Sequence, residues 1–173
     1  MVRTYKKGKG IILGENIEIG ENVILWNYIV IGDNVKIGDG TRIGSFCDIG
    51  ESVVIGNNCN IQAHVTISNG CKIGNNVFIG PNTTFLNDKF PYSRPLAPPM
   101  VEDNVIIGGG VIILPDITIK ENSVIAAGSI VTKDVPSDTV VSGFPAKFMM
   151  TRKEYEAKKK LFIESKHHER NKP

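Results

Sequence analysis

Residues 53–85, VVIGNNCNIQAHVTISNGCKIGNNVFIGPNTTF, repeat with a period of six. Every sixth position holds a large apolar residue: Ile55, Ile61, Ile67, Ile73, Ile79 and Phe85. Two positions before each of these stands a smaller residue: Val53, Cys59, Val65, Cys71, Val77 and Thr83. A period of six fits neither an α-helix nor an ordinary alternating strand. It is typical of the short repeats that build a parallel β-helix.

The repeat extends well beyond this stretch. The column of large residues begins at Leu13, reaches Phe85 without a break, and resumes from Val101 to Val131. Sixteen residues separate Phe85 from Val101, which is one repeat plus ten. Four prolines in this interval keep it out of helix and sheet, so we predict a projecting loop at about residues 86–100.

Composition fits one domain with a long, thin core. The chain has 173 residues, 41% of them hydrophobic, and a formal net charge of +2. The weak charge gives no reason to expect nucleic-acid binding, and no apolar run is long enough for a membrane span. The first residues lack the apolar segment of a signal peptide, so we expect a cytoplasmic protein that does not bind membranes.

A second boundary follows Pro145, where the periodicity ends. Thr151 and Glu154 have the spacing of a capping box, which predicts a helix that runs to about Lys166. We therefore divide the chain into a β-helix domain at residues 1–148, including the loop, and a C-terminal helix with a charged tail at residues 149–173.

The three cysteines are spaced by twelve residues at 47, 59 and 71, which invites a metal or disulfide interpretation. Each occupies the small inward position of its repeat, where a buried apolar side chain is expected. Neighbouring repeats face different walls of a triangular prism, so disulfides are not expected. This agrees with a reducing compartment, and we predict no metal site.

Three repeats make one coil, so residues eighteen apart stack on the same corner. Two corners of the N-terminal half carry ordinary turn residues, Asn, Gly and Ser. The third carries Tyr28, Phe46, His64 and Asn82, which suggests a surface used for contact. After a ten-residue insertion this corner continues through Gly110 and Gly128.

The residues around Gly110 and Gly128 are unusually small: Gly108, Gly109, Ala126 and Ala127. Such a stripe lets an extended ligand, such as a pantetheine arm, lie against the backbone. The alternative is that small residues merely permit tight corners.

The repeats, together with AGSIVTKD at residues 127–134 and SGFPAK at 142–147, resemble the left-handed β-helix acyltransferases that use acetyl-CoA or another acyl-CoA. The left hand comes from this resemblance, because ordinary parallel crossovers are right-handed. The resemblance implies an all-β triangular prism with one extruded loop and a short C-terminal α-helix. It also implies a homotrimer with active sites between subunits.

Within that group, IGSFCDI at residues 43–49, FLND at 85–88 and IIGGGVIILPDITI at 106–119 are most similar to nucleotide-linked 3-amino sugar N-acetyltransferases. The resemblance implies acetyl-CoA as co-substrate and a UDP- or dTDP-linked amino sugar as acceptor, for surface polysaccharide biosynthesis. It places Asn87 near the acceptor amine. The related O-acetyltransferases have a catalytic His at the position of Gly110, so its absence favours N-acylation.

The resemblance and the corner pattern together give a set of candidate site residues. Asn87 would orient the amine, and His64 is the rival catalyst as a general base. Substrate contacts are expected from Tyr28, Phe46, Asn82, Asp88 and Arg94, with Tyr28, Phe46 and Asn82 holding the nucleotide's base and ribose and Arg94 and Lys89 near its diphosphate. The third corner, with His64 and Asn82, is expected beneath the loop that bears Asn87. The cofactor residues expected are Gly109, Gly110, Ala127, Gly128, Thr132, Lys133 and Lys147.

Two other functions remain possible from the sequence, and two are not supported by it. An O-acetyltransferase of a small sugar or alcohol and a noncatalytic trimeric scaffold remain alternatives. A γ-class carbonic anhydrase has the same fold but needs three histidine zinc ligands, whereas His64 is the one histidine in the repeats. A nucleotidyltransferase is unsupported, because no α/β domain with a Gly-rich phosphate loop precedes the repeats.

Overall fold

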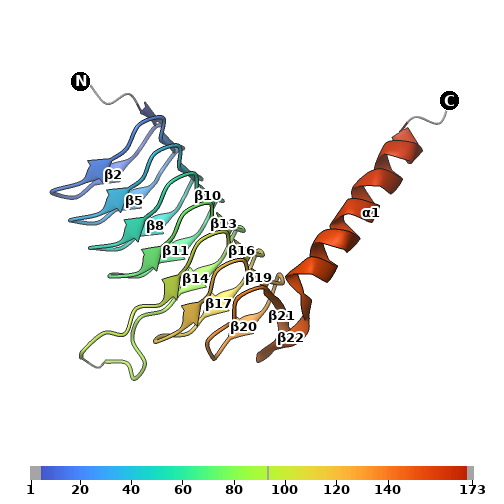
Figure 1. Cartoon of the computed structure of the whole chain (residues 1–173). Coiled ribbons are helices and arrows are strands. Elements are labelled where there is room, and N and C mark those ends of the chain that lie inside the picture. Colours follow the sequence, from blue (N-terminus) through green and yellow to red (C-terminus); the bar gives the residue numbers. More distant parts are fainter. Residues whose placement is uncertain (1–4, 93, 171–173) are drawn as a thin grey trace.

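The hexads build three parallel walls in the computed structural model of the protein, which describes residues 5–92 and 94–170. Figure 1 shows the coils stacked one above another, with a helix leaving the end of the stack. The first residues of the predicted β-helix domain, 1–4, and the last residues of the predicted tail, 171–173, lie outside the described part. The predicted all-β left-handed parallel β-helix, with one extruded loop and a C-terminal helix, is confirmed.

Almost every repeat contributes a strand of two residues. Sheet A contains β1 (Lys6–Lys7), β4 (Ile24–Leu25), β7 (Arg42–Ile43), β10 (Asn60–Ile61), β13 (Phe78–Ile79), β16 (Ile106–Ile107), β19 (Val124–Ile125), β21 (Thr139–Gly143) and β22 (Ala146–Thr151). Sheet B contains β2 (Ile12–Leu13), β5 (Val30–Ile31), β8 (Asp48–Ile49), β11 (Thr66–Ile67), β14 (Thr84–Phe85), β17 (Ile112–Ile113) and β20 (Ile130–Val131). Sheet C contains β3 (Glu18–Ile19), β6 (Lys36–Ile37), β9 (Val54–Ile55), β12 (Lys72–Ile73), β15 (Met100–Val101) and β18 (Thr118–Ile119).

The register confirms the predicted coil of eighteen residues. Ile43 pairs with Ile61, eighteen positions later. The step becomes twenty-eight where Lys72 pairs with Met100, so the ten-residue insertion lies between these two strands. The chain therefore closes one full coil across the loop, and the corner positions above the loop stay in line with those below it.

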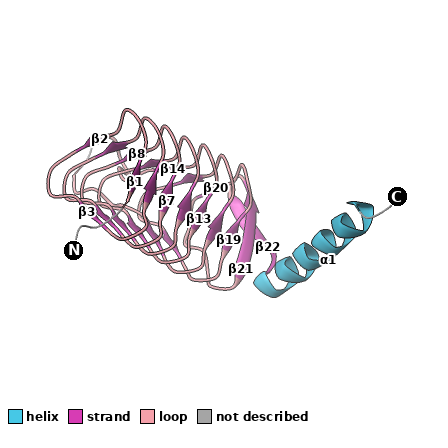
Figure 2. Cartoon of the chain, turned by 90° about the horizontal axis from the view of Figure 1, so that it is seen from above, coloured by secondary structure: helices cyan, strands magenta, loops and turns pink. Residues whose placement is uncertain are grey.

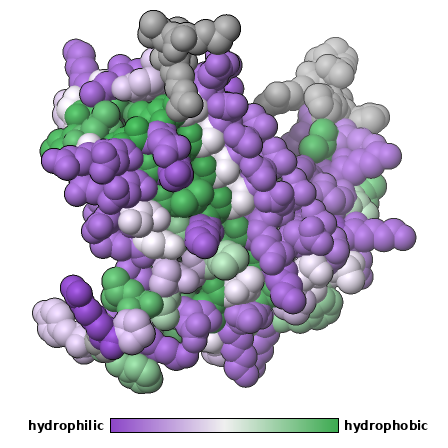
Figure 3. Space-filling view, turned by 60° about the vertical axis from the view of Figure 1, so that its left-hand side comes forward, coloured by the Kyte–Doolittle hydropathy of each residue, from purple (hydrophilic) through white to green (hydrophobic). Residues whose placement is uncertain are grey.

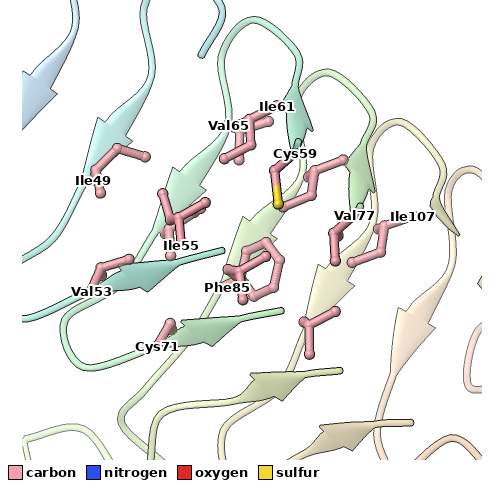
Figure 4. Packing of buried hydrophobic residues seen from close by; sticks show 14 of the residues in the cluster. Ile49, Val53, Ile55, Cys59, Ile61, Val65, Cys71, Val77, Phe85 and Ile107 are labelled. Carbon is pink, nitrogen blue, oxygen red and sulfur yellow. The ribbon is translucent and has the colours of Figure 1, made fainter. Parts of the chain in front are cut away.

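The core is a single column of apolar side chains between the three walls. The large and small positions of the hexads both point inward, and Figure 4 shows them meeting along the axis of the prism. Among the described residues, no buried side-chain nitrogen or oxygen lacks a hydrogen-bond partner. Phe85, completely buried, is the largest of these side chains.

The C-terminal end differs from the sequence expectation. β21 adds to sheet A in parallel with β19, and β22 then returns antiparallel to β21 at the edge of that sheet. Hexad periodicity ends here because the chain turns back at Phe144 and Pro145 instead of continuing to a further wall. The hairpin was not predicted.

The helix α1 (Arg152–Arg170) begins where the sequence predicts it. Thr151 and Glu154 form the capping box: the Thr151 N–H donates to Glu154 Oε2 at 2.7 Å, and the Glu154 N–H donates to Thr151 Oγ1 at 3.3 Å. The Arg152 guanidinium donates to the Asn122 carbonyl at 3.0 Å, which ties the first turn to the prism. Beyond this turn α1 extends away from the coils (Figure 2).

We expect Phe85→Ala to lower the free energy of unfolding by about 3–5 kcal/mol, because it removes a completely buried ring from a column that cannot close around the cavity. Urea denaturation measures this change. The control is Ile12→Ala on the outer face of β2, where the side chain is 64% exposed. A similar loss in both variants would contradict a core role for Phe85.

The three cysteines are buried and unpaired, as the repeat position predicts. Burial raises the pKa of all three thiols, and that of Cys71 to about 12. Since the thiolate is the reactive form, we expect native protein at about pH 8.5 to resist thiol reagents and denatured protein to react fully. Rapid labelling of the native protein would show that the prism opens locally.

Candidate functional site

The corner between sheets A and B, called here the A–B corner, carries the unusual side chains. Tyr28, Phe46 and His64 stack there, and all three are exposed and lie in the left-handed region, with φ of 56°, 61° and 59°. Bulky side chains rarely adopt this conformation, in contrast to the Asn and Gly residues at the same position elsewhere. The corner therefore keeps three rings at positions where turn chemistry alone favours smaller residues.

The three rings form one continuous stack. The centroids of Tyr28 and Phe46 are 5.3 Å apart, and those of Phe46 and His64 are 5.0 Å apart, with interplanar angles of 16° and 12°. Both faces of Phe46 are thus covered, and Tyr28 also lies over Gly10, where a Cβ would come within 2.5 Å of its ring. In the single chain these faces are therefore occupied by neighbouring groups, and the role of Tyr28 and Phe46 in holding the base stays a prediction.

The upper part of the corner is open. The register places Gly110 above Asn82, since the Gly110 N–H donates to the Pro81 carbonyl at 2.7 Å, and Gly128 follows in the next coil. A Cβ at Gly110 or Gly128 would meet nothing within 4 Å. Gly108 is different: a Cβ there would lie 2.5 Å from the Ala127 nitrogen, so Gly108 is needed for close stacking of the coils. Tight stacking of the coils thus explains Gly108, whereas a ligand groove at Gly110 and Gly128 stays a prediction.

A row of backbone N–H groups on this corner lacks partners, which the sequence reasoning missed. On the corner between sheets C and A, side-chain oxygens accept from the N–H one coil below: Asn57 Oδ1 from Asp39 at 2.8 Å, and Asn75 Oδ1 from Asn57 at 2.9 Å. On the A–B corner this ladder ends when Ser45 Oγ accepts from the Asn27 N–H at 3.1 Å.

The ladder ends because the next residues in the stack have no side-chain acceptor: Ala63, Pro81, Gly109 and Ala127. The N–H groups of Ser45, Ala63 and Gly109 consequently have no acceptor within residues 5–92 and 94–170. The signal was present in the sequence, in the alanine, proline and glycine at eighteen- and twenty-eight-residue spacing. By the geometry of the ladder, each of these N–H groups points toward the residue one coil above it, on the same corner as His64 and Asn82.

The extruded loop leaves the prism at another corner. It follows β14, so it projects between sheets B and C, the B–C corner, at the lower left of Figure 1. Sheet B therefore separates Asn87 from His64 and Asn82 in one chain. The expectation that these two residues lie beneath the loop is wrong, because β14 carries the chain across sheet B after Asn82.

Contacts within the loop hold its base against the prism. Asn87 Nδ2 donates to the Asn69 carbonyl at 3.1 Å, and the Asn87 carbonyl accepts from the Ala97 N–H at 2.7 Å. Lys89 forms an ion pair with Asp116 at 2.9 Å, so this lysine is already neutralised in the single chain. Arg94 is exposed at the outer part of the loop.

The predicted cofactor residues divide between the two corners. Thr132 and Lys133 line a hollow of about 400 Å³ at the B–C corner, together with Asp88 and Lys89 of the loop. Lys147 lies opposite Ser142 in the C-terminal hairpin, whose Gly143 N–H donates to Ser129 Oγ at 3.1 Å, next to Gly128. The predicted site residues of one chain thus fall into two groups, one on each edge of sheet B.

Hydrophobic surface lies between columns of hydrophilic residues on the face shown in Figure 3. The described residues contain no group of three or more His, Cys, Asp or Glu side chains arranged to hold a metal ion. Within the same residues, no helix has the length and apolarity needed to cross a membrane.

Comparison with known proteins finds acetyltransferases among the relatives of this chain. The chain is 42% identical over 85 residues to galactoside O-acetyltransferase of Lactococcus lactis, covering 44% of this chain and 40% of the relative. It is 40% identical over 67 residues to 2,3,4,5-tetrahydropyridine-2,6-dicarboxylate N-acetyltransferase of Staphylococcus aureus, covering 39% of this chain and 28% of the relative. The chain thus spans less than half of the length of either curated relative.

Among solved structures, the chain is similar to AntD, an N-acyltransferase from Bacillus cereus determined as a variant with dTDP-4-amino-4,6-dideoxyglucose and coenzyme A. The TM-score is 0.51 with 20% identity, and the match covers 93% of this chain and 91% of AntD. At this identity the likeness shows a common fold. The model of the bacterial transferase hexapeptide family (six repeats) matches residues 16–51, 34–69, 52–87 and 98–133, more than half of the chain, and the protein therefore belongs to that family.

Proposed function

We propose that this protein is an acetyl-CoA-dependent N-acetyltransferase that acylates the amino group of a nucleotide-linked amino sugar. The observation that carries the proposal is the open upper end of the A–B corner. There the Gly109 N–H has no acceptor among the described residues, and space lies free outside Gly110 and Gly128. Membership of a transferase family and acetyltransferase relatives support the acyl-transfer class.

The same corner favours an amine over an alcohol as acceptor. Gly110 supplies no imidazole, and His64 lies two coils below it, roughly 10 Å at about 4.8 Å per coil. An alcohol needs a base to remove its proton during attack, which contributes about 10²- to 10⁴-fold in rate. A neutral amine is nucleophilic without one, so the absence of a base near Gly110 affects it least.

In the proposed reaction the amine nitrogen attacks the thioester carbonyl carbon of acetyl-CoA. The unpaired Gly109 N–H, or that of Ala127, donates to the oxyanion of the tetrahedral intermediate. The C–S bond then breaks, CoA leaves as the thiolate, and the proton lost by the nitrogen goes to that sulfur. Asn87 orients the amine, and most of the acceleration comes from alignment of the two substrates in one cleft.

A second copy of the chain completes this site. Asn87, Asp88 and Arg94 lie on the B–C corner, whereas His64, Asn82 and Gly109 lie on the A–B corner of the same chain. A neighbouring subunit that brings its loop against the A–B corner joins the two groups of residues. We therefore propose a homotrimer with three such clefts, in agreement with what the sequence resemblance implies.

We expect acetyl-CoA-dependent thiol release with UDP- or dTDP-linked 3-amino or 4-amino sugars. A panel of these acceptors, with the matching 3-hydroxy and 4-hydroxy sugars and galactosides as controls, measures the preference directly. Turnover of the hydroxyl compounds without any amine would replace the proposal by an O-acetyltransferase. Failure to bind or turn over acetyl-CoA with any acceptor would favour a noncatalytic scaffold.

His64→Asn distinguishes a contact role from a general base, because Asn tolerates the left-handed backbone at this position but cannot act as a base. We expect kcat to fall by less than about tenfold, with any larger change in KM for the sugar, since a missing base would cost about 10²- to 10⁴-fold. Steady-state kinetics at several pH values measure both. A loss of more than 10²-fold in kcat at unchanged KM would make His64 the catalytic base.

A further inference from the structure

A hollow on the outer face of sheet A, beside the A–B corner, is assigned to none of the roles above. It has a volume of about 390 Å³ and is lined by Trp26, Arg42, Ser45, Asn60, Gln62 and Ala63, with Gly44 and Ile61 behind them. We call it the Trp26 hollow. It lies two coils below the open end of the corner, on the side of the corner that faces sheet A.

The hollow exists because a glycine lies between two residues with large side chains at the same corner position of successive coils. Trp26, Gly44 and Gln62 occupy this position in three successive coils. Gly44 has no side chain because a Cβ there would lie 2.5 Å from the Ala63 nitrogen. A slot of two coil spacings, roughly 10 Å, therefore opens between the indole and the Gln62 amide.

The groups around the slot are matched to a planar, anionic ligand. Trp26 is 55% exposed, lines the hollow and is not part of the ring stack of Tyr28, Phe46 and His64. Gln62 Nε2 donates to Asn60 Oδ1 at 2.7 Å, which fixes two amides with further donors and acceptors free. Base edges are recognised by such amides, and aromatic faces stack on bases.

Positive charge and free donors lie in the same place. The Arg42 guanidinium is exposed at the start of β7 and has no ion-pair or hydrogen-bond partner in the described part of the chain. Two of the unpaired N–H groups, those of Ser45 and Ala63, belong to residues that line the hollow. A guanidinium next to backbone N–H groups is a combination that binds phosphate oxygens.

We infer that the Trp26 hollow binds a nucleoside diphosphate, with its base against Trp26 and its phosphates at Arg42 and the Ser45 and Ala63 N–H groups. This inference rests on the proposed function, because it identifies the nucleotide as that of the acceptor sugar. The sugar then extends along the A–B corner past His64 and Asn82 toward Gly109. In the single chain the faces of Tyr28 and Phe46 are occupied by neighbouring groups, and Trp26 supplies the stacking face instead.

Trp26 is the only tryptophan of the chain, so its fluorescence reports directly on the hollow. We expect saturable quenching of full-length protein by UDP or dTDP in titrations excited at the red edge of indole absorption. A parallel titration with CoA separates the two nucleotide sources, because CoA also carries a base and a diphosphate. Quenching by CoA alone, or by no nucleotide, would overturn the inference.

Arg42→Gln tests the phosphate contact without removing the reporter. We expect it to raise the Kd of the quenching nucleotide by about tenfold or more, as for loss of a hydrogen bond to a charged group. The matched control is Lys72→Gln, which removes one exposed positive charge from β12 on sheet C. Equal thermal midpoints of the two variants confirm intact folding, and an unchanged Kd in Arg42→Gln would contradict the assignment.

Kinetics separate this inference from the proposed function. If an amino sugar is acetylated but Arg42→Gln leaves its KM unchanged, the function stands and the nucleotide is held elsewhere. If UDP or dTDP binds through Arg42 but no amino sugar is acetylated, the hollow stands and the proposed reaction fails.

Discussion

Hydrogen bonding between coils, with a step of eighteen residues outside the loop and the C-terminal hairpin, is the constraint on which the rest of this structure depends. Each two-residue strand pairs in parallel with the strand one coil away, so each corner residue lies directly over its counterpart. Interstrand spacing then fixes neighbouring corners about 4.8 Å apart. This forces glycine at Gly44 and Gly108, where a Cβ would enter the backbone of the next coil. The same stacking places residues that are one coil apart in the sequence in a column on the surface of the prism.

The columns explain both stability and site formation. Where a corner repeats Asp or Asn, each side-chain oxygen satisfies the N–H of the coil below, as at Asp33 and Glu15, 2.7 Å apart. The corner then has few free polar groups with which to bind a ligand. Where alanine, proline and glycine replace these acceptors on the A–B corner, N–H groups stay available. Replacement of Asp or Asn by Ala, Pro or Gly thus has two effects at once. It removes a hydrogen bond between coils, and it leaves an N–H group that can donate to a ligand.

The ring stack follows the same logic. A left-handed backbone costs a bulky residue roughly 1–2 kcal/mol, and stacking of adjacent rings returns about 0.5–1.5 kcal/mol per pair. Tyr28, Phe46 and His64 are tolerated because the register places their rings 5.0 to 5.3 Å apart. The stack holds His64 in place and leaves its far side toward Asn82, at the boundary between the ringed and open parts of the corner.

The sequence was sufficient for whatever depends on periodicity. The walls, the coil length, the ten-residue insertion, the buried cysteines and the capping box at Thr151 all follow from the spacing of residues in the sequence. The position of Asn87 relative to His64 did not follow, because it requires knowing which corner comes after β14. The Trp26 hollow did not follow from the sequence, because Trp26 lies two residues before the left-handed corner position and the gap at Gly44 appears only when the coils are stacked. The hairpin of β21 and β22 was not predicted, because the turn at Phe144 lies outside the hexad repeat and no periodic pattern marks it.

The fixed coil spacing also sets the length that the ligand proposed for the A–B corner must have. The levels of Trp26, Gly44 and Gln62 define the hollow, and the levels of Asn82 and Gly110 follow at one-coil steps. A ligand anchored at Arg42 and Ala63 must therefore extend two coils, roughly 10 Å, before its reacting group reaches the Gly109 N–H. The repeat cannot shorten this distance by side-chain adjustment, since each coil is set by backbone hydrogen bonds. In the reaction that we propose, the length of the linkage between anchoring group and reacting amine, more than any single side chain, would then select the acceptor.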